Sequence, residues 1–241
     1  MTSMFKHLQN LETALNGYAR RLQITPSTQA VADSPNHTSS PPSCPRASPR
    51  DTVIVNDRSG SMSSRDYRPS RLAGGVKAAT AYINARLGQC SQDRVALAAF
   101  NDTAKTLVPL TLITERERLL RALDRITATG GTDIGSGLKV TMELLDQTPT
   151  QERQRHLVLL TDGHGGSPVA KADCLKRQYE VVIDVVGIGG TPDAVNESLL
   201  RAVATTEPDG FNHYRFIKDS HELEKHYQDL ATGLIWRGKD K

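Results

Sequence analysis

The stretch that decides the fold reads Val53-Ile54-Val55-Asn56-Asp57-Arg58-Ser59-Gly60-Ser61-Met62. A short apolar run is followed at once by one carboxylate and two hydroxyls on alternate positions, Asp57, Ser59 and Ser61, as at a buried strand that ends in a tight polar loop. Mg²⁺ prefers such oxygen ligands, because this hard cation demands near-octahedral coordination at about 2.0–2.1 Å. The stretch therefore predicts a strand of a buried sheet with metal-binding side chains at its end.

Two further segments belong with this loop. Gly130-Gly131-Thr132-Asp133 precedes an expected helix, and Leu159-Leu160-Thr161-Asp162-Gly163 ends a second apolar run. Ligands of open α/β sheets bind outside the carboxyl ends of the strands, where such loops meet. We therefore expect Thr132 and Asp162 to lie beside Asp57 at one edge of the sheet.

Taken together, Asp57-x-Ser59-x-Ser61, Thr132 and Asp162 resemble the metal-ion-dependent adhesion site of von Willebrand factor A-type (vWA) domains of the intracellular bacterial type. The resemblance covers the order of elements from about residue 52 to about residue 236. It implies that the two serines and Thr132 contact a cation directly, while the two aspartates act mostly through water. It also implies Mg²⁺, with Mn²⁺ possible, and a protein partner that presents Asp or Glu to the metal.

From Thr52 onward the pattern alternates between strands and helices. Near-continuous apolar runs such as Val181-Val182-Ile183-Asp184-Val185-Val186 are typical of parallel strands that are buried on both faces. The pattern predicts an α/β fold with a doubly wound, mostly parallel six-stranded sheet, helices on both faces and an antiparallel edge at 106–111. The expected strands are 52–57, 94–101, 106–111, 156–162, 181–188 and 213–217, and the expected helices are 69–87, 115–127, 134–147, 168–178, 193–205 and 219–235.

The first 51 residues have a different composition. Residues 1–25 carry apolar side chains at helical spacing, which predicts an amphipathic helix: Met4, Leu8, Leu11, Leu15, Tyr18 and Leu22. Residues 26–51 are rich in Pro and Ser and predict a flexible linker, so that the vWA-like domain spans 52–236. The pattern leaves open whether the helix packs back on the domain or docks a second partner.

Composition and charge narrow the function classes. The chain of 241 residues has a formal net charge of +3, and the five Lys/Arg and two Asp/Glu of residues 1–50 leave 25 of each sign in residues 51–241. That balance implies no nucleic-acid partner. No apolar run reaches about 18 residues and the N-terminus has no signal-peptide pattern, so we expect no membrane span and a cytoplasmic location. Three widely spaced cysteines, Cys44, Cys90 and Cys174, predict reduced thiols.

Other chemistries fit the sequence less well. The segment from His221 to His226 lacks the second histidine that a zinc-protease motif needs at 225, where Lys stands, so we expect both histidines to be solvated. Gly187-Ile188-Gly189-Gly190 lacks the next glycine of a dinucleotide loop, because residue 192 is Pro. No G-x-S-x-G elbow surrounds Ser59 or Ser61.

We therefore expect a Mg²⁺-dependent protein-binding module without enzymatic activity, acting as an adaptor in an intracellular multi-protein, signalling or stress system. The alternative is a metal-assisted hydrolase or phosphatase-like enzyme that uses the same cation as a Lewis acid. Its base would be His164, which otherwise lies at the rim of the site. Arg58 either pairs with an acidic partner or is solvated, and Asp133 caps a helix and holds the Thr132 loop.

Overall fold

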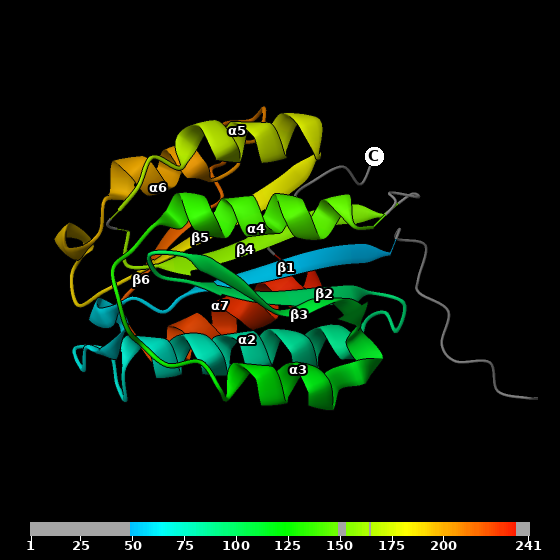
Figure 1. Cartoon of the computed structure of the whole chain (residues 1–241), viewed down its shortest axis with the longest axis horizontal. Coiled ribbons are helices and arrows are strands. Elements are labelled where there is room, and N and C mark those ends of the chain that lie inside the picture. The colour runs from blue at the N-terminus through cyan, green and yellow to red at the C-terminus, as the bar shows by residue number, and fades with distance from the viewer. Residues whose placement is uncertain (1–48, 149–152, 164, 235–241) are drawn as a thin grey trace, which may run out of the picture. The chain divides into compact units, whose positions relative to one another are not determined.

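The computed structural model describes residues 49–148, 153–163 and 165–234 (Figure 1). Its strands are β1 (Arg50–Asp57), β2 (Arg94–Phe100), β3 (Ala104–Leu112), β4 (Gln154–Thr161), β5 (Val181–Ile188) and β6 (Tyr214–Ile217). They form one sheet in the order β3-β2-β1-β4-β5-β6, in which only the β2–β3 pairing is antiparallel. The predicted doubly wound, mostly parallel six-stranded sheet is confirmed.

Helices cover both faces of the sheet. Figure 1 shows α4 (Ile134–Asp146), α5 (Val169–Gln178) and α6 (Glu197–Val203) above it, and α2 (Arg71–Leu87), α3 (Arg116–Leu123) and α7 (Ser220–Thr232) below it. Successive strand residues point to opposite faces. Val53 and Val55 accordingly belong to the core under α4, whereas Ile54 belongs to the core with α2 and α7. Both faces being buried explains why the parallel strands read as unbroken apolar runs.

Capping residues fix where two helices begin. The helix expected at 69–87 begins at Arg71, because the hydroxyl of Ser70 accepts a hydrogen bond from the Ala73 N–H at 3.1 Å. The helix expected at 193–205 is shorter and begins at Glu197, where the side chain of Asn196 accepts from the Leu199 N–H. The preceding residues Pro192–Ala194 form a separate 3₁₀ turn.

The first strand begins earlier than the composition suggests. Arg50 and Asp51 are buried in β1, so the prediction that the linker extends to residue 51 is wrong at these two positions. The Arg50 N–H donates to an Asp93 carboxylate oxygen at 2.7 Å, and Asp51 pairs with Arg94 and Arg153. The free-energy cost of burying these charges is offset by their pairing, and a composition profile does not reveal such pairs. The helix predicted at 1–25 and the linker up to residue 48 lie outside the described residues.

The last helix buries a histidine that we expected to be solvated. His226 is 6% exposed and lies on the inward face of α7 with Leu223, Tyr227 and Leu230, whereas His221 is exposed as predicted. The prediction for His226 is wrong, because spacings of three and four residues from Leu223 place it on the core side. Burial lowers the pKa of His226 to about 4.

The cysteines also differ from expectation. Cys174 is a free thiol, as predicted, but Cys90 is disulfide-bonded, so the prediction of a reduced thiol is wrong at Cys90. Spacing along the chain shows no such bond, because a disulfide depends on the distance between residues in the folded protein. The prediction for Cys44 lies outside the described residues. Within the described ranges, no helix is long and apolar enough to cross a membrane.

A buried group of ionisable side chains crosses the middle of the sheet. Asp184 of β5 accepts hydrogen bonds from His156 of β4 and from His213, whose Nδ1 lies 2.9 Å from the carboxylate. The other ring nitrogen of His213 lies 3.1 Å from Glu207. Two carboxylates facing both nitrogens require both to be donors, so His213 is an imidazolium. No local pattern in the sequence predicted this group.

The antiparallel edge strand β3 is irregular. Its register against β2 shifts on both sides of Leu97, which marks a bulge. Pro109 lies within the strand and has no N–H to donate, and Lys105 stands exposed near its beginning. The strand runs from Ala104 to Leu112, somewhat longer than the predicted 106–111.

Candidate metal centre

Asp57, the last residue of β1, lies fully buried at the carboxyl edge of the sheet. Its Oδ1 accepts from the Ser59 N–H at 2.7 Å, and its Oδ2 accepts from the Thr161 hydroxyl at 2.7 Å. Burial raises the pKa of Asp57 to about 6, and the neighbouring Asp162 carboxylate adds to the rise, although the hydrogen bonds from Thr161 and Ser59 oppose it. The surroundings of this carboxylate are therefore short of positive charge.

The two serines of the loop face each other. The Ser59 and Ser61 hydroxyl oxygens lie 3.0 Å apart, with Ser59 buried and Ser61 exposed. The loop is a 3₁₀ turn over Gly60–Ser63 and is anchored by the fully buried side chain of Met62. The turn thus presents both hydroxyls beside the carboxylate of Asp57.

The loop that carries Thr132 is bonded to the serine loop through backbone. The Gly60 N–H donates to the Gly130 carbonyl at 2.9 Å, and the Thr129 N–H donates to the Arg58 carbonyl at 2.8 Å. Gly130 has φ of +77°, a conformation that favours glycine. The structure therefore brings Thr132, two residues further on and half-buried, to the edge where Asp57 ends its strand.

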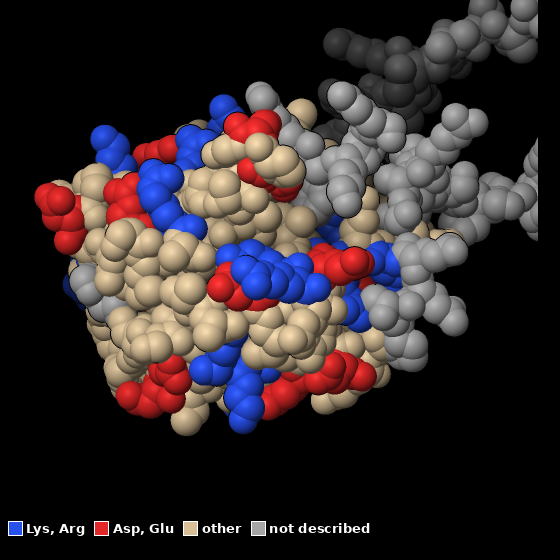
Figure 2. Space-filling model, turned by 90° about the horizontal axis from the view of Figure 1, so that it is seen from above, with Lys and Arg blue, Asp and Glu red and all other residues tan. Residues whose placement is uncertain are grey.

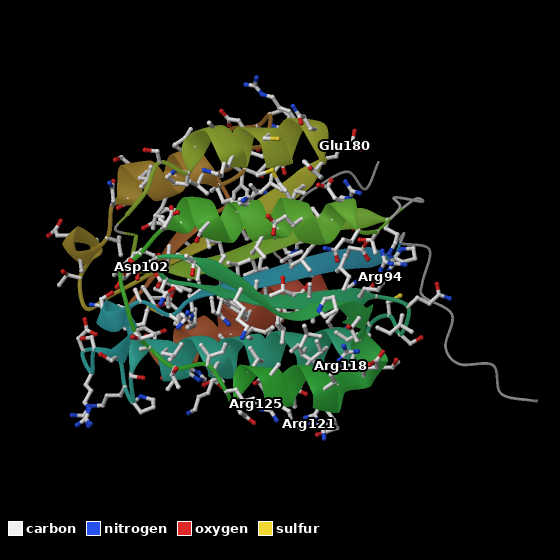
Figure 3. The ribbon with its side chains drawn as sticks, viewed as in Figure 1. Arg94, Asp102, Arg118, Arg121, Arg125 and Glu180 are labelled. Carbon is white, nitrogen blue, oxygen red and sulfur yellow. The ribbon has the colours of Figure 1, made fainter. Side chains whose placement is uncertain are left out.

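The turn between β2 and β3 supports the same loop. The Asp102 carboxylate accepts from the Gly131 N–H at 2.9 Å, and the Asn101 carbonyl accepts from the Asp133 N–H at 2.7 Å. Figure 3 shows Asp102 at the end of the sheet opposite Arg94. Asp133 caps α4 as predicted, with its side chain accepting from the Gly135 N–H. These contacts hold Thr132 from both sides.

Asp162 follows β4 and supplies a second buried carboxylate. Its Oδ2 lies 3.2 Å from the Arg71 guanidinium, and the residue is 2% exposed. Its Oδ1 is buried and has no hydrogen-bond partner among the described residues. A buried polar atom without a partner is unfavourable and calls for an explanation such as a bound ion. The donor set of hydroxyls and carboxylates fits a hard divalent cation.

The sequence also placed Arg58 and His164 beside the site. Arg58 is half-buried and donates to the Asn101 side chain at 3.2 Å, so it is not simply solvated. His164 lies outside the described residues. Within the described part of the chain, no group of three or more His, Cys, Asp or Glu side chains is arranged to hold a metal. A cation at this edge would therefore depend on the hydroxyls of Ser59, Ser61 and Thr132.

The sequence pattern did not reveal Thr161 and Arg71, which bond to the predicted ligands Asp57 and Asp162. Nor did it reveal Asp66, Asn101 and Asp102, which bond to residues next to the predicted ligands. Thr161 carried a signal, because a hydroxyl directly before Asp162 in a strand that ends at the site is available to bond a neighbouring carboxylate. Arg71, Asp66, Asn101 and Asp102 carried none in their spacing. Their contacts depend on how loops from different strands meet.

The face that bears α4, α5 and α6 is mixed in charge. Figure 2 shows acidic and basic side chains intermingled across it, separated by uncharged surface. Such a surface is unlike the clustered Lys and Arg of a nucleic-acid site.

Comparison with known proteins agrees with this architecture. Residues 52–164 match the family model of the von Willebrand factor type A domain. An uncharacterized protein of Synechocystis is 28% identical over 202 residues, which is 82% of this chain but 43% of that protein. The chain thus spans less than half the length of that relative.

Two solved structures share the fold. The conserved hypothetical protein BatB of Bacteroides thetaiotaomicron has a TM-score of 0.63 at 21% identity, covering 77% of this chain and 98% of BatB. The vWF domain of the type V pili tip protein Mfa5 of Porphyromonas gingivalis has a TM-score of 0.64 at 14% identity, covering 81% of this chain and 99% of that domain. Residues 52–164 therefore match the von Willebrand factor type A domain in sequence, and the fold described above is the one that these two solved structures share.

Proposed function

We propose that the domain binds one divalent cation, Mg²⁺ or Mn²⁺, through Asp57, Ser59, Ser61, Thr132 and Asp162, and through it binds an Asp or Glu carboxylate of a partner protein. Domains of the von Willebrand factor A type often mediate protein–protein interactions, which supports a binding role. The proposed module is not an enzyme.

One observation carries the proposal. Asp57 and Asp162 are two buried carboxylates close enough to repel each other, and Asp162 Oδ1 has no hydrogen-bond partner among the described residues. Arg71 offsets one of these charges, and burying a second like charge beside it is unfavourable unless a further positive charge joins them. A divalent cation would offset the remaining charge and satisfy Asp162 Oδ1.

The side chains have separate tasks in this proposal. Asp57 and Asp162 supply the two negative charges, while Ser59, Ser61 and Thr132 supply neutral oxygen ligands. A cation held mainly by such neutral ligands would remain electrophilic and would attract a further carboxylate from a partner, and the low dielectric of an interface would strengthen that contact. Partner recognition then depends on one acidic side chain together with the loops around the site.

The wider role stays a prediction. The sequence leads us to expect an adaptor in the cytoplasm, whereas the disulfide at Cys90 is more typical of an oxidising compartment. The described residues contain no observation that favours the alternative hydrolase or phosphatase-like activity.

Cation binding is tested with a matched pair of serines. Ser61→Ala should weaken Mg²⁺ binding by about tenfold or more, because it removes a proposed ligand worth about 1.4 kcal/mol. Ser63→Ala is the control, since this exposed hydroxyl donates to the Gly60 carbonyl at 2.7 Å and is not a proposed ligand. Isothermal titration calorimetry with Mg²⁺ and Mn²⁺ measures both. Equal affinity in Ser61→Ala and wild type would contradict the assignment.

Partner binding is tested next, by capture from native cell extract with Mg²⁺ and with EDTA. Proteins lost on chelation, and lost in Ser61→Ala but not in Ser63→Ala, are the expected partners. For a partner so found, replacing its contacting Asp or Glu with Ala should abolish binding. A partner retained in EDTA would remove the cation from the mechanism.

Thr132 should matter more for the partner than for the cation. It comes from a loop separate from Asp57 and the serines, so Thr132→Ala should lower partner affinity roughly tenfold with a smaller loss of Mg²⁺ affinity. Thr127→Ala, at an exposed position before the same loop, is the control. Equal losses of both affinities would make Thr132 an ordinary ligand.

A further inference from the structure

A buried arginine lies directly against the candidate metal centre. Arg71, the first residue of α2, is 9% exposed, and its Nη1 lies 3.2 Å from Asp162 Oδ2. The rest of the guanidinium is bound by Asp66, with Nε 3.0 Å from Oδ1 and Nη2 2.5 Å from Oδ2. Arg71 therefore bridges one proposed ligand of the cation and one carboxylate outside the ligand set.

Asp66 extends this bridge to a third loop. Its Oδ2 also accepts a hydrogen bond from the Gly190 N–H at 3.1 Å. The hydrogen bond with Arg71 lowers the pKa of Asp66 to about 2, so that carboxylate is ionised at neutral pH. The loops after β1, β4 and β5 are thus joined through the Arg71–Asp66 pair.

The two oxygens of Asp162 have different surroundings. Oδ2 is held by Arg71, while Oδ1 is buried and unpartnered among the described residues. The contact with Arg71 fixes the orientation of the carboxylate. It leaves Oδ1 available to a bound cation or to the water molecules around that cation. It also places a permanent positive charge beside a ligand, because guanidinium does not lose its proton in proteins.

We propose that Arg71 is the internal counter-ion of the metal centre. It offsets the charge of Asp162 when no cation is bound and opposes the approach of a divalent cation, so it sets the cation concentration at which the site fills. The inference rests on the proposed function and deepens it by naming a residue that regulates the site.

Replacing Arg71 with an uncharged residue should have two opposite effects, on stability and on Mg²⁺ affinity. Without the guanidinium, Asp162 is left as a buried charge with no counter-ion, so the cation-free protein loses stability. The same substitution removes a repulsion from the cation, so affinity for Mg²⁺ rises. An arginine with a merely structural role would lower stability without raising affinity.

Arg71→Met and Arg86→Met form the matched test. Both arginines lie on α2 with 9% exposure and are paired to a buried aspartate, but Arg86 pairs with Asp93, at the other end of the helix. Arg71→Met should bind Mg²⁺ about tenfold more tightly by calorimetry. Its melting temperature should fall in EDTA and recover in saturating Mg²⁺. Arg86→Met should melt lower in both conditions with unchanged Mg²⁺ affinity.

Two milder variants cover the case in which Arg71→Met does not fold. Arg71→Lys keeps the charge and should keep an affinity near that of the wild type. Asp66→Asn removes the competing carboxylate, whose side chain is 33% exposed, and should weaken Mg²⁺ binding a few-fold because Arg71 then acts on Asp162 alone.

The outcomes separate this inference from the proposed function. Wild type that binds Mg²⁺, with Arg71→Met binding it equally or more weakly, would overturn the role of Arg71 and leave the metal site standing. If Arg71→Met does not fold, unchanged or tighter binding by Asp66→Asn would overturn it. Wild type that binds neither Mg²⁺ nor Mn²⁺ would overturn the proposed function itself.

Discussion

Two regions of the sheet bury carboxylates in opposite ways. At the carboxyl edge, Asp57 is held by neutral donors from Ser59 and Thr161, and burial raises its pKa to about 6. In the middle of β5, burial alone would raise the pKa of Asp184 as well, but His156 and His213 overcome that effect and lower it. The two aspartates are similarly buried, at 0% and 3% exposure, so the difference lies in their partners.

The comparison separates a structural charge from a binding charge. Asp184 has a resident imidazolium beside it and needs nothing more, because the ion pair is complete within the fold. Asp57 has hydrogen bonds from Ser59 and Thr161, but none of the described residues places a cationic side chain in contact with it. The anionic charge at this edge is only partly compensated, and it is here that we propose a cation from solution binds.

The largest effect should come from removing the compensated carboxylate. Asp184→Ala should lower the free energy of unfolding by about 3–5 kcal/mol, because it leaves the His213 imidazolium buried with Glu207 as its remaining carboxylate partner. Urea denaturation measures the change. Mg²⁺ affinity should stay at the wild-type value provided the variant folds. A loss of unfolding free energy below 1 kcal/mol would show that the Asp184–His213 pair is not essential for stability.

The matched change at the edge should have the opposite sign. Asp57→Asn should raise the stability of the cation-free protein by about 1–3 kcal/mol, since it removes a buried charge whose pKa is raised to about 6. It should also abolish Mg²⁺ binding. Urea denaturation in EDTA together with calorimetry tests both, and destabilisation comparable to Asp184→Ala would erase the distinction between the two regions.

A smaller effect should appear with pH at His226. Its pKa in the folded protein is lowered from 6.5 to about 4, so between these values the unfolded chain binds more protons and stability falls as pH falls. His226→Gln removes this titration and should be less sensitive to acid than the wild type by about 1–2 kcal/mol at pH 5. Thermal melts at pH 7 and pH 5 provide the measurement, with His221→Gln, at an exposed position, as the control. Parallel curves for wild type and His226→Gln would refute the assignment.

Much of the fold was accessible from the sequence, for a physical reason. A strand buried on both faces must be largely apolar, so Val53-Ile54-Val55 and the other apolar runs of the sequence predict the parallel sheet. Helix ends were less certain, because Ser70 and Asn196 act as caps only in the backbone conformation that they adopt here.

The candidate site, like the fold, could be predicted from the sequence only in part. Asp57, Ser59 and Ser61 are close in sequence, and strand ends meet at one edge, so their grouping with Thr132 and Asp162 followed from topology. The bridge from Arg71 to Asp162 spans 91 positions, and the contact of Asp184 with His213 spans 29 positions. Such pairings depend on side-chain packing that no local pattern encodes. The burial of His226, in contrast, was available from its spacing on α7 and was missed.

The edges of the sheet bear on how this domain can meet other chains. Strand β3 offers a poor template for a further strand, because Pro109 interrupts its donors, its register is bulged near Leu97 and Lys105 is exposed. The opposite edge, β6, has four residues. Extension of the sheet by an incoming chain, whether a partner peptide or another copy during aggregation, is disfavoured at both ends, which leaves recognition to the loops.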